Sequence, residues 1–162
     1  MSDAAATLHK TVERMEARAL AYQRIYSWPA CVDPSNGALM LALHADLDAI
    51  TVPAELGVRT QRVLCLRMLA GPVLLLPTGS GTTGPDWLFL TGPAQALRHR
   101  TIVELGRIGA RFHQRSTFVP LPPTRVNGSE VRWSTSPVSG RELPPWAAVI
   151  AALRSAALGC TQ

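Results

Sequence analysis

The chain has 162 residues, which is enough for one domain with a hydrophobic core of its own. Hydrophobic residues make up 47% of the chain and charged residues 17%, a composition that excludes an intrinsically disordered protein. The formal net charge is +5, and Lys10 is the one lysine among 16 basic residues. This charge predicts a modest attraction to nucleic acid, anionic lipid or acidic proteins.

The first segment of the chain, residues 3–26, is predicted to be a helix. Its apolar side chains recur at alternating spacings of four and three, namely Leu8, Val12, Met15, Ala19, Tyr22 and Tyr26. Such a narrow stripe packs on a core or forms the seam of a dimer, and we favour packing on the same domain. Trp28 is followed by a proline, which restricts it to extended geometry and ends the helix.

Two hairpins are predicted in the next part of the chain. Apolar runs flank the turn formers of residues 33–37, and this pattern indicates a first hairpin. A third short strand at 48–52 leads into a helix that Pro53 opens and a Gly-Pro pair stops at residues 71–72. Continuous apolar runs at 71–77 and 87–93 predict a second hairpin across a glycine-rich loop.

The last third of the chain is predicted to contain two helices and one or two strands. A helix extends from about Ala94 to Phe112, and residues 118–123 are extended but too rich in proline for a central strand. Residues 131–137 form a strand, and the final helix begins near Trp146. Hairpins that alternate with helices predict one α+β domain over residues 1–162. Its antiparallel or mixed sheet is built from hairpins and packed by about four helices.

The cysteines indicate a reducing compartment. They are widely spaced and provide neither a disulfide framework nor the paired spacing of metal ligands: Cys31, Cys65 and Cys160. The first two stand in apolar stretches, so we expect both to be buried. The polar N-terminal segment lacks the pattern of a secretory signal, and the longest apolar run, residues 63–77, is too interrupted to cross a bilayer. We therefore expect a cytoplasmic protein that has no membrane association.

The sharpest chemical pattern is an acidic pair, Asp46 and Asp48, in LALHADLDAITVP. On a continuous strand this spacing would place both carboxylates on one face, where they could hold a metal ion. The alternation of apolar residues is interrupted between His44 and Asp46, however, and this interruption predicts a turn. We favour a polar turn that contains Asp46, with Asp48 at the start of the next strand, and the metal site is the alternative.

An arginine-rich face is predicted on the helix that ends near residue 112. At 100° per residue, Arg100, Arg107 and Arg111 lie opposite the apolar face, and Arg115 follows them. Guanidinium groups bind phosphate and carboxylate well, so these four residues are candidates for binding an anion or nucleic acid. Because Glu104 lies within one helical turn of two of these arginines, local ion pairing is the alternative.

Two segments resemble a group of small actinobacterial proteins, some of which are described as primase/polymerase-like. The segments are YSWPACVDPSNGALMLAL and RWSTSPVSGRELPPWAAVIAALR. The resemblance implies an α+β nucleotidyl-transfer fold with metal-bound acidic residues, in which Asp46 and Asp48 match the paired acidic motif. The pattern of that family also includes a serine and a histidine one residue apart, and this chain contains no Ser-x-His.

Together these patterns predict a non-catalytic binding or interaction module with no cofactor. Its expected partner is nucleic acid or an acidic protein, bound through the arginine-rich helix. One alternative is a reduced primase/polymerase-like enzyme that uses Asp46 and Asp48 for nucleotidyl transfer. The other is a structural protein that forms a homodimer through the N-terminal helix.

Overall fold

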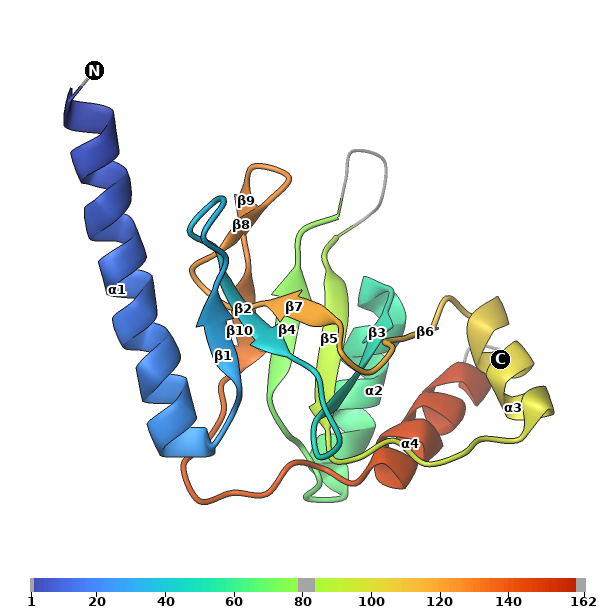
Figure 1. The fold of residues 1–162 in the computed structure, drawn as a ribbon. Coiled ribbons are helices and arrows are strands. Elements are labelled where there is room, and N and C mark those ends of the chain that lie inside the picture. The colour runs from blue at the N-terminus through green and yellow to red at the C-terminus, as the bar shows by residue number, and fades with distance from the viewer. Residues whose placement is uncertain (1, 79–83, 160–162) are drawn as a thin grey trace.

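The computed structural model describes residues 2–78 and 84–159, without the side chains of residues 2–6 and 8. The helices are α1 (Ser2–Tyr26), α2 (Ala54–Leu66), α3 (His99–Arg107) and α4 (Trp146–Leu158). The strands are β1 (Ala30–Val32), β2 (Leu39–Ala42), β3 (Asp48–Val52), β4 (Val73–Leu76), β5 (Asp86–Thr91), β6 (Arg111–Phe112), β7 (Phe118–Pro120), β8 (Arg125–Val126), β9 (Ser129–Glu130) and β10 (Arg132–Thr135). The protein therefore has the predicted α+β fold (Figure 1).

The strands form two larger sheets and a small hairpin, and every pairing between the described strands is antiparallel. The five-stranded sheet has the order β10-β4-β5-β3-β6, the three-stranded sheet has the order β1-β2-β7, and β8 pairs with β9. Both predicted hairpins are confirmed, because β1 pairs with β2 and β4 pairs with β5. Part of the loop predicted between β4 and β5, residues 79–83, lies outside the described residues. The proline-containing β7 forms an edge, as predicted.

The first hydrophobic core lies between the two sheets and is closed at one side by α1 (Figure 1). Leu39 and Leu41 alternate on the inner face of β2, and Leu88 and Leu90 alternate on the facing surface of β5. From α1, Met15 and Ala19 are buried in this core. The stripe of the N-terminal helix thus packs on its own domain along this length, whereas the side chain of Leu8 lies outside the described part.

The second core lies on the opposite face of the five-stranded sheet, beneath α2 and α4. Phe89 of β5 and Ile50 of β3 point to this side because side chains alternate between the faces of a strand. The close approach of α2 to β5 depends on Gly57, where a Cβ atom would lie 2.3 Å from Cγ of Trp87. A glycine at this helical position leaves the space that the Trp87 side chain occupies beneath α2.

The expected burial of two cysteines is wrong. Cys31 and Cys65 are both exposed, and neither is in a disulfide. Cys31 stands between Ala30 and Val32, which occupy the inner face of β1, so alternation directs its thiol outward. Cys65 directly follows Leu64, which is buried, and the 100° step of the helix moves the next side chain toward solvent.

Among the described residues, none of the helices combines the length and the hydropathy needed to cross a bilayer. The longest helix, α1, carries charged side chains along its solvent-facing side and projects past the sheets at its N-terminal end (Figure 1).

Candidate functional site

The acidic pair is divided between a turn and a buried strand, as predicted. Asp46 is exposed in the turn that the bridge between His44 and Leu47 closes. Asp48 begins β3 and is 1% exposed, and its Oδ2 accepts a hydrogen bond of 2.7 Å from the backbone N–H of Ala94. Within residues 2–78 and 84–159, no group of three or more His, Cys, Asp or Glu side chains is arranged to hold a metal ion.

A second polar pair, which the sequence patterns did not reveal, joins β3 to the end of β6. The Nε2 atom of His113 lies 2.7 Å from Oγ1 of Thr51. Burial is the main cause that lowers the pKa of His113, and the nearby Arg111 guanidinium lowers it further. Although a hydroxyl beside an imidazole is the arrangement of an activated nucleophile, Thr51 is 1% exposed, so a substrate has no access to it.

The arginine-rich helix is shorter than predicted. We expected a helix from about 94 to 112, but α3 covers His99–Arg107 and ends in a reversal at Gly109, whose φ is +85°. The N–H of Ala110 donates to the carbonyl of Leu105 and the N–H of Gly109 donates to Gly106, the two bonds of a Schellman motif. The chain then turns back to pair β6 with β3, which periodicity alone could not indicate.

The early end of α3 changes the position of one candidate arginine. Arg111 lies on β6 and not on the helix, and its Nη2 donates to the carboxylate of Asp86 on β5. Arg115 is exposed in the following loop. Of the predicted face, therefore, Arg100 and Arg107 remain together on α3.

Two arginines from two helices pair with one carboxylate at this end of the molecule, and a third arginine, Arg107, is on the same helix as that carboxylate. Arg100 donates from Nε to Glu104 at 2.8 Å, and Nη2 of Arg154 on α4 lies 4.0 Å from the other oxygen of the same carboxylate. The hydrogen bond from Arg100 is the main cause that lowers the pKa of Glu104, and the charges of Arg154 and Arg107 lower it further. We call these residues the basic surface: Arg100, Arg107, Arg154 and the Glu104 among them.

A shallow groove of about 310 Å³ runs beside the basic surface between α3 and α4. Its floor is apolar, with Leu105, Ile108 and Ala157, and its polar lining residues are Glu104 and Arg154. The sequence indicated only the α3 arginines. Arg154 lies 50 positions after Glu104 in the chain and joins the α3 arginines because α4 lies beside α3 in the fold (Figure 1).

A separate concave site lies at the opposite side of the fold, where α1 ends (Figure 1). Four of the nine aromatic side chains gather there: Tyr22, Tyr26, Trp28 and Trp133. The Trp28 ring is at the centre, with its centroid 5.1 Å from that of Tyr26 and 6.4 Å from that of Trp133. Burial raises the pKa of Tyr22, whose hydroxyl accepts a 3.3 Å hydrogen bond from the Trp133 indole.

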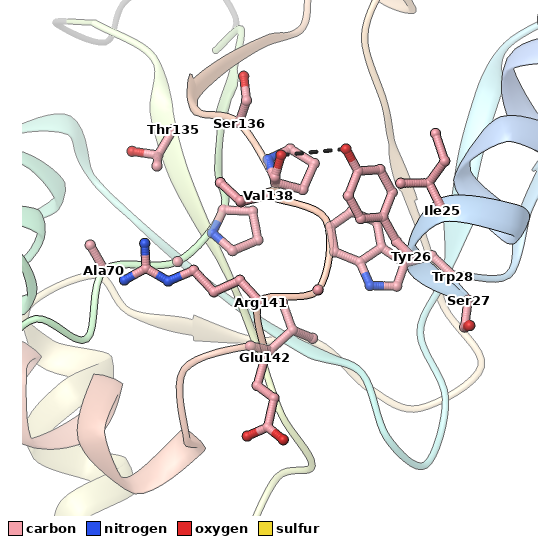
Figure 2. Close-up of a pocket in the computed structure, with 15 residues that line it drawn as sticks. Ile25, Tyr26, Ser27, Trp28, Ala70, Thr135, Ser136, Val138, Arg141 and Glu142 are labelled. Atoms are coloured by element: carbon pink, nitrogen blue, oxygen red, sulfur yellow. Dashed lines mark hydrogen bonds between the residues drawn. The ribbon is translucent and has the colours of Figure 1, made fainter.

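Two members of this cluster, Tyr26 and Trp28, form one wall of a pocket of about 230 Å³, which we call the aromatic pocket. The opposite wall is the segment from Thr135 to Leu143, and the Tyr26 hydroxyl joins the walls by donating to the Pro137 carbonyl at 3.4 Å. Figure 2 shows the guanidinium of Arg141 across the pocket from the rings of Tyr26 and Trp28. Tyr26 and Trp28, which are two residues apart, were a sequence signal for this wall, but Arg141 joins them only in the fold.

The resemblance to primase/polymerase-like proteins stays a prediction. No known family model, no curated protein sequence and no solved structure matches this chain significantly. Any function given to the chain must therefore be inferred from its own residues and geometry.

Proposed function

We propose that this protein is a non-catalytic binding module that docks nucleic acid on the basic surface. The observation that carries the proposal is the charge imbalance around Glu104: this carboxylate pairs with Arg100 and Arg154, and Arg107 is on the same helix, so three positive charges stand against one negative charge. Arginine presents several N–H donors in a fixed planar geometry and remains charged at all physiological pH values. Such clusters bind phosphate groups, whose neutralisation releases condensed counterions.

The position of the arginines supports this proposal. Arg100, Arg107 and Arg154 are all exposed, and they come from two different helices, so they spread charge over a surface wider than one helical face. The groove between the helices provides an apolar strip beside the charges. The division of the acidic pair and the burial of Thr51 support a binding role over a catalytic one.

The proposal is tested by titrating the protein into fluorescein-labelled single-stranded and double-stranded oligonucleotides at about 50 and 200 mM salt. The triple variant Arg100→Gln, Arg107→Gln, Arg154→Gln removes three positive charges and keeps good helix formers. We expect it to bind more weakly, with a salt slope reduced by about three if all three arginines contact phosphates. In the opposite direction, Glu104→Gln should strengthen binding because it removes the one carboxylate in the cluster.

The matched control removes the same number of charges elsewhere, by Arg14→Gln, Arg24→Gln and Arg125→Gln, which are exposed on α1 and β8. This variant should keep most of the affinity and the parent's salt slope. Equal losses in both triple variants would mean that net charge alone attracts the nucleic acid. If the parent binds polyglutamate but no oligonucleotide at low salt, the partner is an acidic protein and the nucleic-acid proposal is wrong.

A further inference from the structure

The aromatic pocket has two walls of different chemistry. Tyr26 and Trp28 give it an apolar, flat side, and the second wall carries Thr135 and Arg141. Its rim is reachable from solvent, because Ile25 and Val138 are 51% and 57% exposed. The lining is divided almost equally between apolar and polar surface, so the pocket offers an apolar part to a ring and polar groups that can fix its orientation.

The basic group of this pocket is Arg141. No salt bridge within the described residues involves Arg141, whereas Arg100, Arg111 and Arg154 all have carboxylate partners. The neighbouring Glu142 does not neutralise it, since Figure 2 shows the Glu142 carboxylate directed away from the Arg141 guanidinium. Arg141 is therefore a charged donor available to an anion at the edge of a partly apolar cavity, and charge-assisted hydrogen bonds are the strong ones.

A second donor lies on the same wall. The Thr135 hydroxyl accepts a hydrogen bond of 2.8 Å from Nε2 of Gln61, a residue of α2 that holds it in place from behind. Because a hydroxyl has one donor and two acceptor sites, accepting from Gln61 leaves the Thr135 proton for another partner. In Figure 2 the Thr135 side chain and the Arg141 guanidinium lie on the same side of the pocket, opposite the aromatic rings.

The size of the cavity limits the ligand. An apolar cavity of about 150 Å³ is large enough for benzene. At about 230 Å³, the aromatic pocket has space for one ring with a short substituent and not for a long chain. The shape and chemistry together require a flat apolar part against Tyr26 and Trp28 and an anionic group within reach of Arg141.

We propose that the aromatic pocket is a binding site for a small organic anion composed of a single flat ring and a carboxylate or phosphate group. The ring packs against Tyr26 and Trp28, and the anionic group accepts hydrogen bonds from Arg141 and Thr135. This site is independent of the basic surface, which lies at the other end of the fold (Figure 1).

The experiment compares four probes on the full chain by protein-observed NMR and calorimetry: benzoate, phenyl phosphate, benzyl alcohol and acetate. Benzoate and phenyl phosphate carry both features and differ in the anion, so they distinguish a carboxylate ligand from a phosphate ligand. Benzyl alcohol carries only the ring, and acetate carries only the charge. We expect at least one of the two ring-bearing anions to bind about tenfold more tightly than both partial probes, with the indole N–H signal of Trp28 shifting on binding.

Two variants locate the site. Arg141→Gln should weaken binding of the ring-bearing anion by about tenfold and leave benzyl alcohol unaffected, because it removes only the charged donor. Val138→Trp places a bulky side chain at the exposed rim and should abolish binding of all ring probes. Because Val138 is exposed, the larger side chain should not disturb folding. Arg125→Gln on β8 is the control for net charge and should bind as the parent does.

Three outcomes would overturn the proposal. The first is no binding of benzoate or phenyl phosphate up to about 10 mM, a concentration at which even a weak single-ring ligand saturates appreciably. The second is equal affinity of the parent and Arg141→Gln for the ring-bearing anions. The third is undiminished binding in Val138→Trp, which would put the probe elsewhere on the molecule.

Discussion

His113, which directly follows β6, is joined to Thr51 in β3, with 2.7 Å between Nε2 and Oγ1. Since burial and Arg111 lower the pKa of His113 below its usual value of 6.5, the neutral imidazole is the form that the folded protein favours. The unfolded chain therefore takes up a proton at a higher pH than the folded chain. The free energy of unfolding should fall as the pH is lowered from 7 through 6.5, and this loss should end below the lowered pKa of the folded state.

The variant His113→Gln tests this pH dependence, because the glutamine amide can still bond to the Thr51 hydroxyl but does not titrate. Urea denaturation between pH 7 and pH 5 should show a smaller loss of stability in the variant than in the parent. The two carboxyl groups with lowered pKa values, Asp33 and Glu104, lose their favourable contacts only at lower pH and so do not confuse the measurement. Identical pH slopes in parent and variant would show that His113 makes no such contribution.

The two aspartates of the acidic pair should differ in their effect on stability. Asp48→Ala removes the buried acceptor of the Ala94 N–H and should lower the free energy of unfolding by about 1–3 kcal/mol. Asp46→Ala changes an exposed turn residue and should stay within about 0.5 kcal/mol of the parent. Both values come from chemical denaturation at pH 7.

The same two variants test for a shared cation. We expect millimolar Mg²⁺ or Mn²⁺ to leave the melting temperature of the parent unchanged. A metal-dependent rise of the parent's melting temperature that both substitutions abolish would mean that the two carboxylates bind one ion together, as the primase/polymerase resemblance implies.

Two helical glycines should respond in opposite directions to alanine. At Gly57 the added Cβ would lie 2.3 Å from Cγ of Trp87, so Gly57→Ala should separate α2 from β5 and lower stability by about 1–3 kcal/mol. At Gly106 of α3 the same atom meets no described heavy atom within 4 Å, so Gly106→Ala should raise stability by about 0.5–1 kcal/mol. Thermal unfolding of each variant, compared with the parent, shows whether the substitution lowers or raises stability. Stabilisation by Gly57→Ala would contradict the close packing of α2 on β5.

Because α1 packs on its own domain, a substitution in its buried face should lower the stability of the monomer and not change an oligomeric state. Met15 is 9% exposed in the first core, so Met15→Ala should lower the free energy of unfolding by about 2 kcal/mol or more. Leu20 is 44% exposed on the same helix, so Leu20→Ala is the matched control. It should change the free energy of unfolding by no more than about 0.5 kcal/mol. Sedimentation analysis accompanies both variants. If α1 were mainly a dimer seam, the melting temperature would depend on protein concentration and Met15→Ala would convert a dimer into a monomer.

Local chemistry was sufficient to predict the elements that depend on neighbours in the chain. In the first hairpin, Oδ1 of Asp33 accepts hydrogen bonds from the N–H and the hydroxyl of Ser35, and Gly37 adopts a φ of +71°. These are properties of the residues themselves, so the turn formers identified the hairpin correctly. The small β8–β9 hairpin also had a local signal, the Asn127-Gly128 pair with both φ values positive, and our prediction overlooked it.

The position at which α3 ends depends on a local sequence signal and also on the tertiary structure. Gly106 and Gly109 were visible in the sequence, and a glycine at Gly109 is what the reversal after α3 requires. Apolar periodicity nevertheless continues to Phe112, because that ring is also partly buried, although on a strand and against Trp146. Periodicity reports which side chains are buried and not which element buries them, so the predicted helix was five residues too long at its end.

The two candidate sites were decided by the tertiary structure. Arg154 reaches Glu104 from 50 positions away, and the Tyr26 hydroxyl reaches the Pro137 carbonyl across 111. From the sequence alone, one helix appeared as an arginine face and another as an apolar stripe that ends in tyrosines. The free energy of hydrophobic burial is non-directional, so it determines that a face is covered but not by which partner. Only the position of α4 beside α3, and of the segment after β10 beside the end of α1, brought these side chains together.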